Sequence, residues 1–270
     1  QEMVKECHDY KCKLERAQYF IAQGDEVKAK VHVKESLELC ESDEQRVEVE
    51  EAYAKILFDI RDYEGAAQYY HSAANRLKGL GEIERYSDAM YWSAQNYLIS
   101  SKFDVAENCA RQAAEVLKDN ITESGRKKYI LQLVCLGDAL FCQKKYSEAL
   151  EVYKEELEIC KVIMPKSEKH ADALEDLGKV QVRLKQFSEA KESLQQACDI
   201  YESLNLDSKY SNTYSELLIC SRKAGDEDLA NSMEQEADNK RKIVWKSVLD
   251  SELKALPTTE KYLSTMVYTN

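Results

Sequence analysis

Residues 136–153 read LGDALFCQKKYSEALEVY, and this stretch decides the fold. Gly137 and Ala149 lie twelve positions apart, on either side of the polar segment Gln143-Lys144-Lys145. Two antiparallel helices that cross closely leave no room for a branched side chain at the crossing point, so each helix places Gly or Ala there. The stretch therefore predicts a helix, a tight turn and a second helix.

The same pairing of small residues recurs along the chain. The pairs are Ala17/Ala29, Ala54/Ala66, Ala94/Ala106, Gly137/Ala149 and Gly178/Ala190, and a sixth copy, Leu218/Ala230, keeps one small partner. The second members follow one another at intervals of 37 to 43 residues. An aromatic residue stands three positions before four of them, at Tyr63, Phe103, Tyr146 and Phe187. Because a ring there can cover the open end of a hairpin, the pattern predicts a tandem array of helical hairpins.

The composition supports an all-helical protein and excludes several classes. Only 8 Gly and 2 Pro interrupt 270 residues, which is typical of long helices. The net charge of -12 argues against binding nucleic acid directly or an anionic membrane surface. No apolar run is long enough to cross a bilayer. Nine cysteines without a CxxC pair predict reduced, buried thiols and an intracellular, reducing compartment, either cytoplasm or nucleus.

The repeats resemble a known family. One copy holds Leu136-Gly137, Leu140, Tyr146, Ala149 and Tyr153, and the next holds Leu177-Gly178, Phe187, Ala190, Leu194 and Ala197. This pattern is similar to the tetratricopeptide repeat (TPR), in which a Leu-Gly in the first helix is followed by an aromatic residue, Ala, a large apolar residue and Ala. Family repeats are 34 residues long, whereas these average about 40. They resemble the long repeats of kinesin light chains, Leu-Gly-Asn-repeat adaptors and Tonsoku-like proteins, without the Asn-rich groove of kinesin light chains.

The resemblance implies an all-α, right-handed α-solenoid of about six hairpins with a C-terminal capping helix. We expect a repeat domain over residues 1–250, with repeats near 10–40, 47–80, 87–118, 130–163, 171–204 and 211–240, and a C-terminal tail over 251–270. The tail is apolar enough to fold back onto the array.

In this family the first helices of the hairpins line a concave groove. The residue after each small residue, and those four positions either side, are predicted to face this groove. They are Glu51, Lys55, Asp59, Tyr91, Gln95, Ile99, Val134, Asp138, Cys142, Glu175, Lys179, Arg183, Ser215, Ile219 and Lys223.

From these positions and their neighbours we select candidate partner-binding residues. They are Tyr91, Trp92, Gln95, Ile99, Val134, Asp138, Phe141, Lys179, Arg183, Arg222 and Lys223. The middle of the groove is aromatic and apolar, and its C-terminal end is basic, which predicts a ligand with apolar anchors and an acidic flank. In the alternative interpretation, Trp92 and Phe141 wedge between repeats, while the basic side chains pair with Glu175, Asp176 and Glu216 on the helix surfaces.

No pattern of residues indicates chemistry. The four histidines lack the spacing of metal ligands, and no Ser, His and carboxylate set defines a catalytic site. We therefore expect no enzyme activity, no cofactor and no metal. The sequence predicts a scaffold or adaptor that binds a peptide or helical segment of a partner protein in the concave groove. The alternative is a structural subunit that docks or forms homo-oligomers through its convex face or its C-terminal helix and tail.

Overall fold

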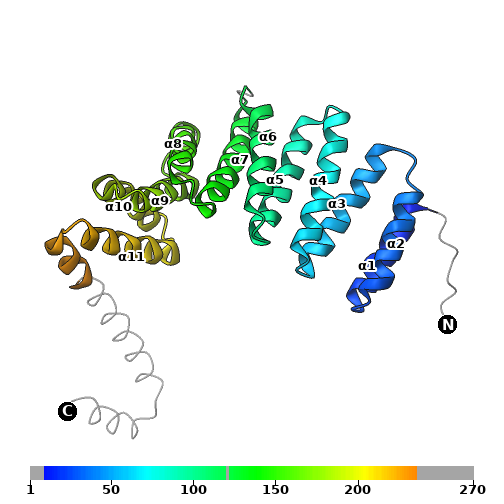
Figure 1. Ribbon diagram of the computed structural model, residues 1–270, viewed down its shortest axis with the longest axis horizontal. Helices are drawn as coiled ribbons and strands as arrows, with labels where there is room; N and C mark the ends of the chain where they lie inside the picture. The colour runs from blue at the N-terminus through cyan, green and yellow to red at the C-terminus, as the bar shows by residue number, and fades with distance from the viewer. Residues whose placement is uncertain (1–8, 120–121, 236–270) are drawn as a thin grey trace, which may run out of the picture.

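The computed structural model describes residues 9–119 and 122–235, and these residues form a row of antiparallel helices that follows an arched path (Figure 1). The helices are α1 (Tyr10–Ala22), α2 (Glu26–Glu38), α3 (Asp43–Asp59), α4 (Tyr63–Gly79), α5 (Ile83–Ile99), α6 (Phe103–Leu117), α7 (Glu123–Cys142), α8 (Tyr146–Ile163), α9 (Glu168–Arg183), α10 (Phe187–Ser203) and α11 (Asp207–Lys223). Residues 227–235 are helical as well. The predicted all-α solenoid of six hairpins is confirmed. The expected capping helix beyond residue 239 and the tail over 251–270 lie outside the described residues.

The paired small residues lie where the helices of each hairpin meet. Ala17, Ala29, Ala94, Ala106 and Ala149 are among those with no exposed surface. At the two glycine positions even a methyl group is too large, because an added Cβ at Gly137 would overlap the ring of Tyr153 and one at Gly178 would lie 2.6 Å from Cγ of Leu194. In both cases the obstructing side chain stands sixteen residues later, on the second helix. The helices are therefore as close as their side chains allow.

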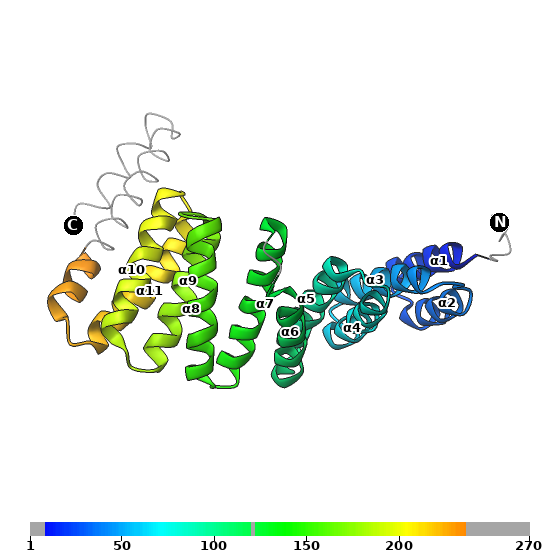
Figure 2. The same ribbon diagram turned by 90° about the horizontal axis from the view of Figure 1, so that it is seen from above.

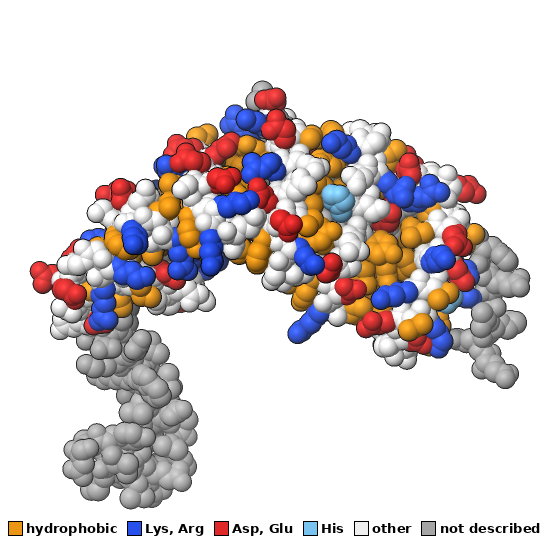
Figure 3. Space-filling model, viewed as in Figure 1, with side chains coloured by type: hydrophobic (Ala, Val, Ile, Leu, Met, Phe, Trp, Pro, Cys, Tyr) orange, Lys and Arg blue, Asp and Glu red, His pale blue; other side chains and the backbone are white. Residues whose placement is uncertain are grey.

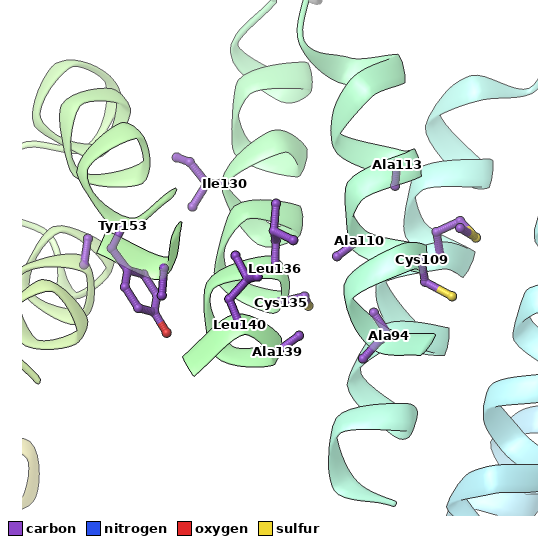
Figure 4. Packing of buried hydrophobic residues seen from close by; sticks show 14 of the residues in the cluster. Ala94, Cys109, Ala110, Ala113, Ile130, Cys135, Leu136, Ala139, Leu140 and Tyr153 are labelled. Carbon is purple, nitrogen blue, oxygen red and sulfur yellow. The ribbon is translucent and has the colours of Figure 1, made fainter. Parts of the chain in front are cut away.

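Small residues also fill the space between consecutive hairpins. Figure 4 shows Ala110 of α6 facing Leu136 of α7, while Cys109 points to the opposite side of α6. All three belong to one buried cluster that runs through the middle of the array. The predicted aromatic caps are present too, since Phe103 and Tyr146 each begin a second helix, and the Tyr146 ring meets that of Phe141 edge-on at 5.3 Å.

Every turn inside a hairpin uses the same backbone geometry. The residues with positive φ in these six turns are Gly24, Arg61, Ser101, Lys144, Lys185 and Gly225. In the fourth turn, Lys145 N–H donates to the carbonyl of Leu140 at 2.9 Å and Lys144 N–H to that of Phe141 at 2.9 Å. These two bonds satisfy the last free carbonyls of the first helix and reverse the chain. Four of the six turns place a residue with a Cβ where glycine is preferred.

The first helices of successive hairpins lie closer together than the second helices do. Figure 2 shows α1, α3 and α5 on one side of the row and α2, α4 and α6 on the other. Among the described residues three of the five successive pairs of first helices are in contact, namely α1 with α3, α5 with α7 and α9 with α11, whereas no two successive second helices make contacts of that extent. The shorter inner layer of an arc has the closer spacing, so the first helices form the inner surface. We call the surface formed by α1, α3, α5, α7, α9 and α11 the first-helix face.

The cysteines agree only in part with the sequence-based prediction. Seven of those in the described residues are free thiols, six of them buried, but Cys142 is exposed. Cys12 is disulfide-bonded, so the prediction that all nine are reduced is wrong at this position. Cys12 lies near the start of the array and is only half-buried, so it lacks the burial that keeps the six buried thiols inert.

The close approach at Gly137 predicts a large effect from a single methyl group. Gly137→Ala should destabilise the protein by about 1–3 kcal/mol through overpacking against Tyr153. Gly79, at the end of α4, has no atom within 4 Å of an added Cβ, so Gly79→Ala is the matched control and should be neutral or slightly stabilising. Urea unfolding of both variants measures the difference, and equal stability would mean that the helices separate freely at this crossing.

The strained turn residues predict a stabilising substitution. Lys144 has φ of 63°, so Lys144→Gly should raise the free energy of unfolding by about 0.5–1 kcal/mol, because release of the Cβ strain exceeds the entropy cost of glycine. Lys144→Ala removes the same charge but keeps the Cβ and should give no such gain. A thermal unfolding series in which alanine matched glycine would contradict this account of the turn.

Candidate partner-binding face

The positions predicted to face the groove are accessible. None of the fifteen is fully buried, from Glu51 on α3 to Lys223 on α11. They all lie on first helices, so the predicted phase gives an open stripe along the first-helix face. The space-filling view shows positive and negative side chains interspersed among apolar ones over the arch rather than a field of one sign (Figure 3).

Several candidate residues converge on a pocket between α5 and α7. This pocket, which we call the apolar pocket, has a volume of about 310 Å³ and is lined by Gln95, Leu98, Ile99, Asp138, Phe141 and Cys142. Ile99 is 51% exposed at its rim. Four of the candidate residues, from two consecutive repeats, thus line the same pocket.

Phe141 and Arg183 are brought together as well. The guanidinium of Arg183 on α9 lies 5.6 Å from the ring centre of Phe141 on α7, which is within the range of a cation–π contact. This contact links the fourth and fifth repeats and places a positive charge beside the apolar pocket.

Trp92 is placed differently from the other candidates. Its ring stacks on Tyr70 of α4 at 6.3 Å and meets Tyr91 edge-on at 5.3 Å, and it does not line the apolar pocket. With 47% of its surface exposed, Trp92 bridges the second and third repeats, as the alternative interpretation predicts.

A second pocket lies further along the first-helix face, between α7, α8, α9 and α11. We call it the acidic pocket; its volume is about 330 Å³, and it is lined by Val134, Glu156, Lys169, Asp172, Glu175, Asp176, Lys179, Lys209 and Asn212. Lys179 binds Glu175 at 2.6 Å and Asp176 at 3.5 Å. Its charge is therefore paired within its own helix, again as the alternative interpretation predicts.

The two remaining basic candidates lie at the C-terminal end of α11. Arg222 forms an ion pair with Glu234, a partner that the sequence analysis did not name, and Lys223 is exposed. Neither lines the apolar or the acidic pocket.

The close packing at Gly137 also determines the position of a carboxyl group, that of Asp138, near the two pockets. Because α7 has no side chain at Gly137, the ring of Tyr153 lies against it, and the Tyr153 hydroxyl donates to Oδ1 of Asp138 at 2.8 Å. Burial raises the pKa of Asp138, although the bond from Tyr153 and the charge of Lys179 oppose the rise. A packing residue thus fixes the position of a carboxyl group on the first-helix face.

Burial raises the pKa of two carboxyl groups of the acidic pocket, whereas that of Asp172 is lowered, despite its burial, by hydrogen bonds from Lys209 and Tyr201. Burial, with the repulsion of Asp138 second, raises the pKa of Asp176 to about 7. Burial and the repulsion of Asp176 also raise the pKa of Glu156 well above its usual value. Such shifts mark groups whose environment disfavours the charged form.

Glu156 is the main residue of this face that the sequence analysis missed. It stands on the apolar stripe of α8, between the buried residues Tyr153 and Cys160, and only 1% of it is exposed. Its signal in the sequence is a lone carboxylate at a core position of a second helix, whereas the phase rule applies to first helices alone.

Comparisons with known proteins agree with this architecture. The family model of the tetratricopeptide repeat matches residues 130–203. The apo form of RapI has a TM-score of 0.70 and 17% identity over 84% of this chain, which spans 63% of RapI. BtubC (BKLC) from P. vanneervenii has a TM-score of 0.64 and 18% identity over 87% of this chain and 92% of its own. A Rap protein complexed with Competence and Sporulation Factor has a TM-score of 0.54 and 15% identity over 96% of this chain and 71% of its own.

The tetratricopeptide-repeat match thus covers the fourth and fifth hairpins, and the similar structures share the all-α repeat solenoid of the whole array. A search of curated protein sequences gives no match. Within residues 9–119 and 122–235, no helix is long and apolar enough to span a membrane, and no cluster of His, Cys, Asp or Glu is arranged to hold a metal ion. The expectation that the chain is not an enzyme stays a prediction.

The raised pKa of Asp176 predicts a pH-dependent stability. Between its usual pKa of 3.8 and about 7 the folded state holds more protons than the unfolded state, so this group makes stability fall as the pH rises through that window. Asp176→Asn should therefore raise the thermal midpoint more at pH 8 than at pH 5, by about 2 °C or more. Asp199→Asn, at an exposed position of α10, is the control, and identical pH profiles for the two variants would contradict this assignment.

Proposed function

We propose that this protein is an interaction scaffold whose first-helix face binds a peptide or helical segment of a partner protein. The observation that carries the proposal is the apolar pocket, in which Leu98, Ile99 and Phe141 from two repeats surround a space of about 310 Å³ on the first-helix face. Concave, mostly apolar pockets with a few polar groups are the usual sites of recognition. The similarly folded Rap protein is complexed with Competence and Sporulation Factor, which supports the use of this fold for binding a partner.

The apolar pocket provides an anchor for one side chain of the partner. Burial of a leucine- or phenylalanine-sized group contributes roughly 1.5–3 kcal/mol, which is enough to fix the register of a bound segment. Gln95 and Asp138 at the same pocket supply polar groups for the backbone of that segment. The net charge of -12 favours a protein partner over nucleic acid or an anionic membrane.

Fewer basic residues are free to bind an acidic flank of the ligand than the sequence indicated. Lys179 and Arg222 are already paired, so Arg183 and Lys223 are the candidates that remain for an acidic group of the partner. Arg183 lies beside the apolar pocket through its contact with Phe141, and it is the better placed of the two.

A second function, docking of the protein as a structural subunit, is favoured by a pocket at the C-terminal end of the array. It has a volume of about 390 Å³ and is lined by Lys191, Glu192, Gln195, Gln196, Leu217 and Leu229. Its residues come from α10, α11 and the helical segment 227–235. The C-terminal helix and tail expected to take part lie outside the described residues. An intracellular location remains a proposal that rests on the seven free thiols.

The scaffold proposal predicts which exposed apolar residue matters. Peptides that bind the full chain can be selected from a random twelve-residue library. They should bind the Ile99→Asp variant at least tenfold more weakly than wild type, because the apolar anchor contributes about 1.5–3 kcal/mol. Val162→Asp is the matched control, since Val162 is 71% exposed on the second helix α8. Fluorescence polarisation measures both.

The expected result is weak binding by the Ile99 variant and unchanged binding by the Val162 variant. Unchanged affinity of Ile99→Asp would overturn the proposed use of the apolar pocket.

A further inference from the structure

The acidic pocket is lined by more carboxyl groups than amino groups. Four carboxyl groups line it, from Glu156 on α8 and from Asp172, Glu175 and Asp176 on α9, against three lysines. Asp138 of α7 adds a further negative charge nearby, because its repulsion raises the pKa of Asp176.

Each of the three lysines already forms an ion pair with a carboxylate other than Glu156. Lys179 binds Glu175 and Asp176, and Lys169 lies 3.4 Å from Asp172. Lys209 is shared between Asp172 and Glu168 at the edge of the pocket. None of these ion pairs includes Glu156.

Glu156 is the group that points to a ligand. It lines the pocket with only 1% of its surface exposed, and its Oε2 atom has no hydrogen-bond partner among the described residues. A buried carboxyl oxygen without a partner costs about 1–3 kcal/mol or more. A donor entering the pocket would recover this free energy, and a charged donor would recover most.

We propose that the acidic pocket receives the ammonium or guanidinium group of a lysine or arginine side chain of the bound segment. This inference rests on the proposed function of the first-helix face and names the chemistry of the partner there. The aliphatic part of a lysine or arginine side chain can pack against Val134, which forms the apolar part of the lining. A cationic head would meet Glu156 and Asp176 and offset the repulsion among the carboxylates.

The positions of the two pockets give the spacing of the recognised residues. Val134 lines the acidic pocket and Asp138 the apolar pocket, and four residues of one helix span about 6 Å. An extended peptide advances about 3.3–3.6 Å per residue. Because the rest of the two linings lies on different helices, this rise is the smallest separation, and the bound segment should carry its basic residue at least about two positions from its apolar anchor.

The first experiment is the peptide selection with the full chain, read by position. We expect enrichment of Lys or Arg at a position at least about two residues from the apolar anchor, and at least tenfold weaker binding of such a peptide to Glu156→Gln or Asp176→Asn. Glu158→Gln, at an exposed position of the same helix α8, makes the same side-chain replacement outside the pocket and should bind normally. Selected peptides with acidic residues, or with no charge preference, at that position would overturn this inference and leave the scaffold proposal intact.

The second experiment does not depend on peptide binding. Methylguanidinium chloride should lower the apparent pKa of the Asp176 carboxyl from about 7 by at least half a unit relative to NaCl of equal ionic strength, read from the side-chain ¹³C resonance. A pKa shift that occurs in wild type and is lost in Glu156→Gln supports the cation site. If that shift is seen but the library yields no binding peptide, only the scaffold proposal fails. No shift beyond the NaCl control would overturn the inference.

Discussion

The close crossing of paired helices is the constraint on which the rest of the structure depends. At Gly137 and Gly178 the second helix places Tyr153 or Leu194 where a first-helix side chain would otherwise stand. Protein interiors are packed too densely to absorb an extra group at such a point. The period of the small residues therefore sets the period of the hairpins, and their stacking produces an inner surface formed by the first helices.

The same constraint reaches the candidate binding face. Because Gly137 admits the ring of Tyr153, the tyrosine hydroxyl meets Asp138 on the side of α7 that borders both pockets. One turn away, Val134 borders the acidic pocket. Packing, polar geometry and recognition are thus linked along a single helix, and the apolar and acidic pockets have a fixed separation that a flexible loop could not provide.

The sequence was sufficient for the fold because the small residues repeat, whereas single positions were harder to predict. The phase rule selected Gln95, Ile99 and Asp138, which line one pocket, because helical periodicity decides which side of a helix is exposed. Their part in binding stays a prediction. Trp92 is only a neighbour of the positions that the rule selects, and its ring stacks on Tyr70 of the preceding repeat. Glu156 reaches the face from a second helix, which the rule does not cover. Contacts between repeats, which no single-helix rule contains, decide both positions.

The most direct test of the central claim is a double-mutant cycle between Gly178 and Leu194. If Leu194 is what excludes a side chain at position 178, Gly178→Ala should destabilise the protein in the presence of Leu194 and be neutral or stabilising in the Leu194→Ala background. The coupling free energy should then exceed about 1 kcal/mol. Additive effects of the two substitutions would show that the glycine is needed for another reason and would contradict the account.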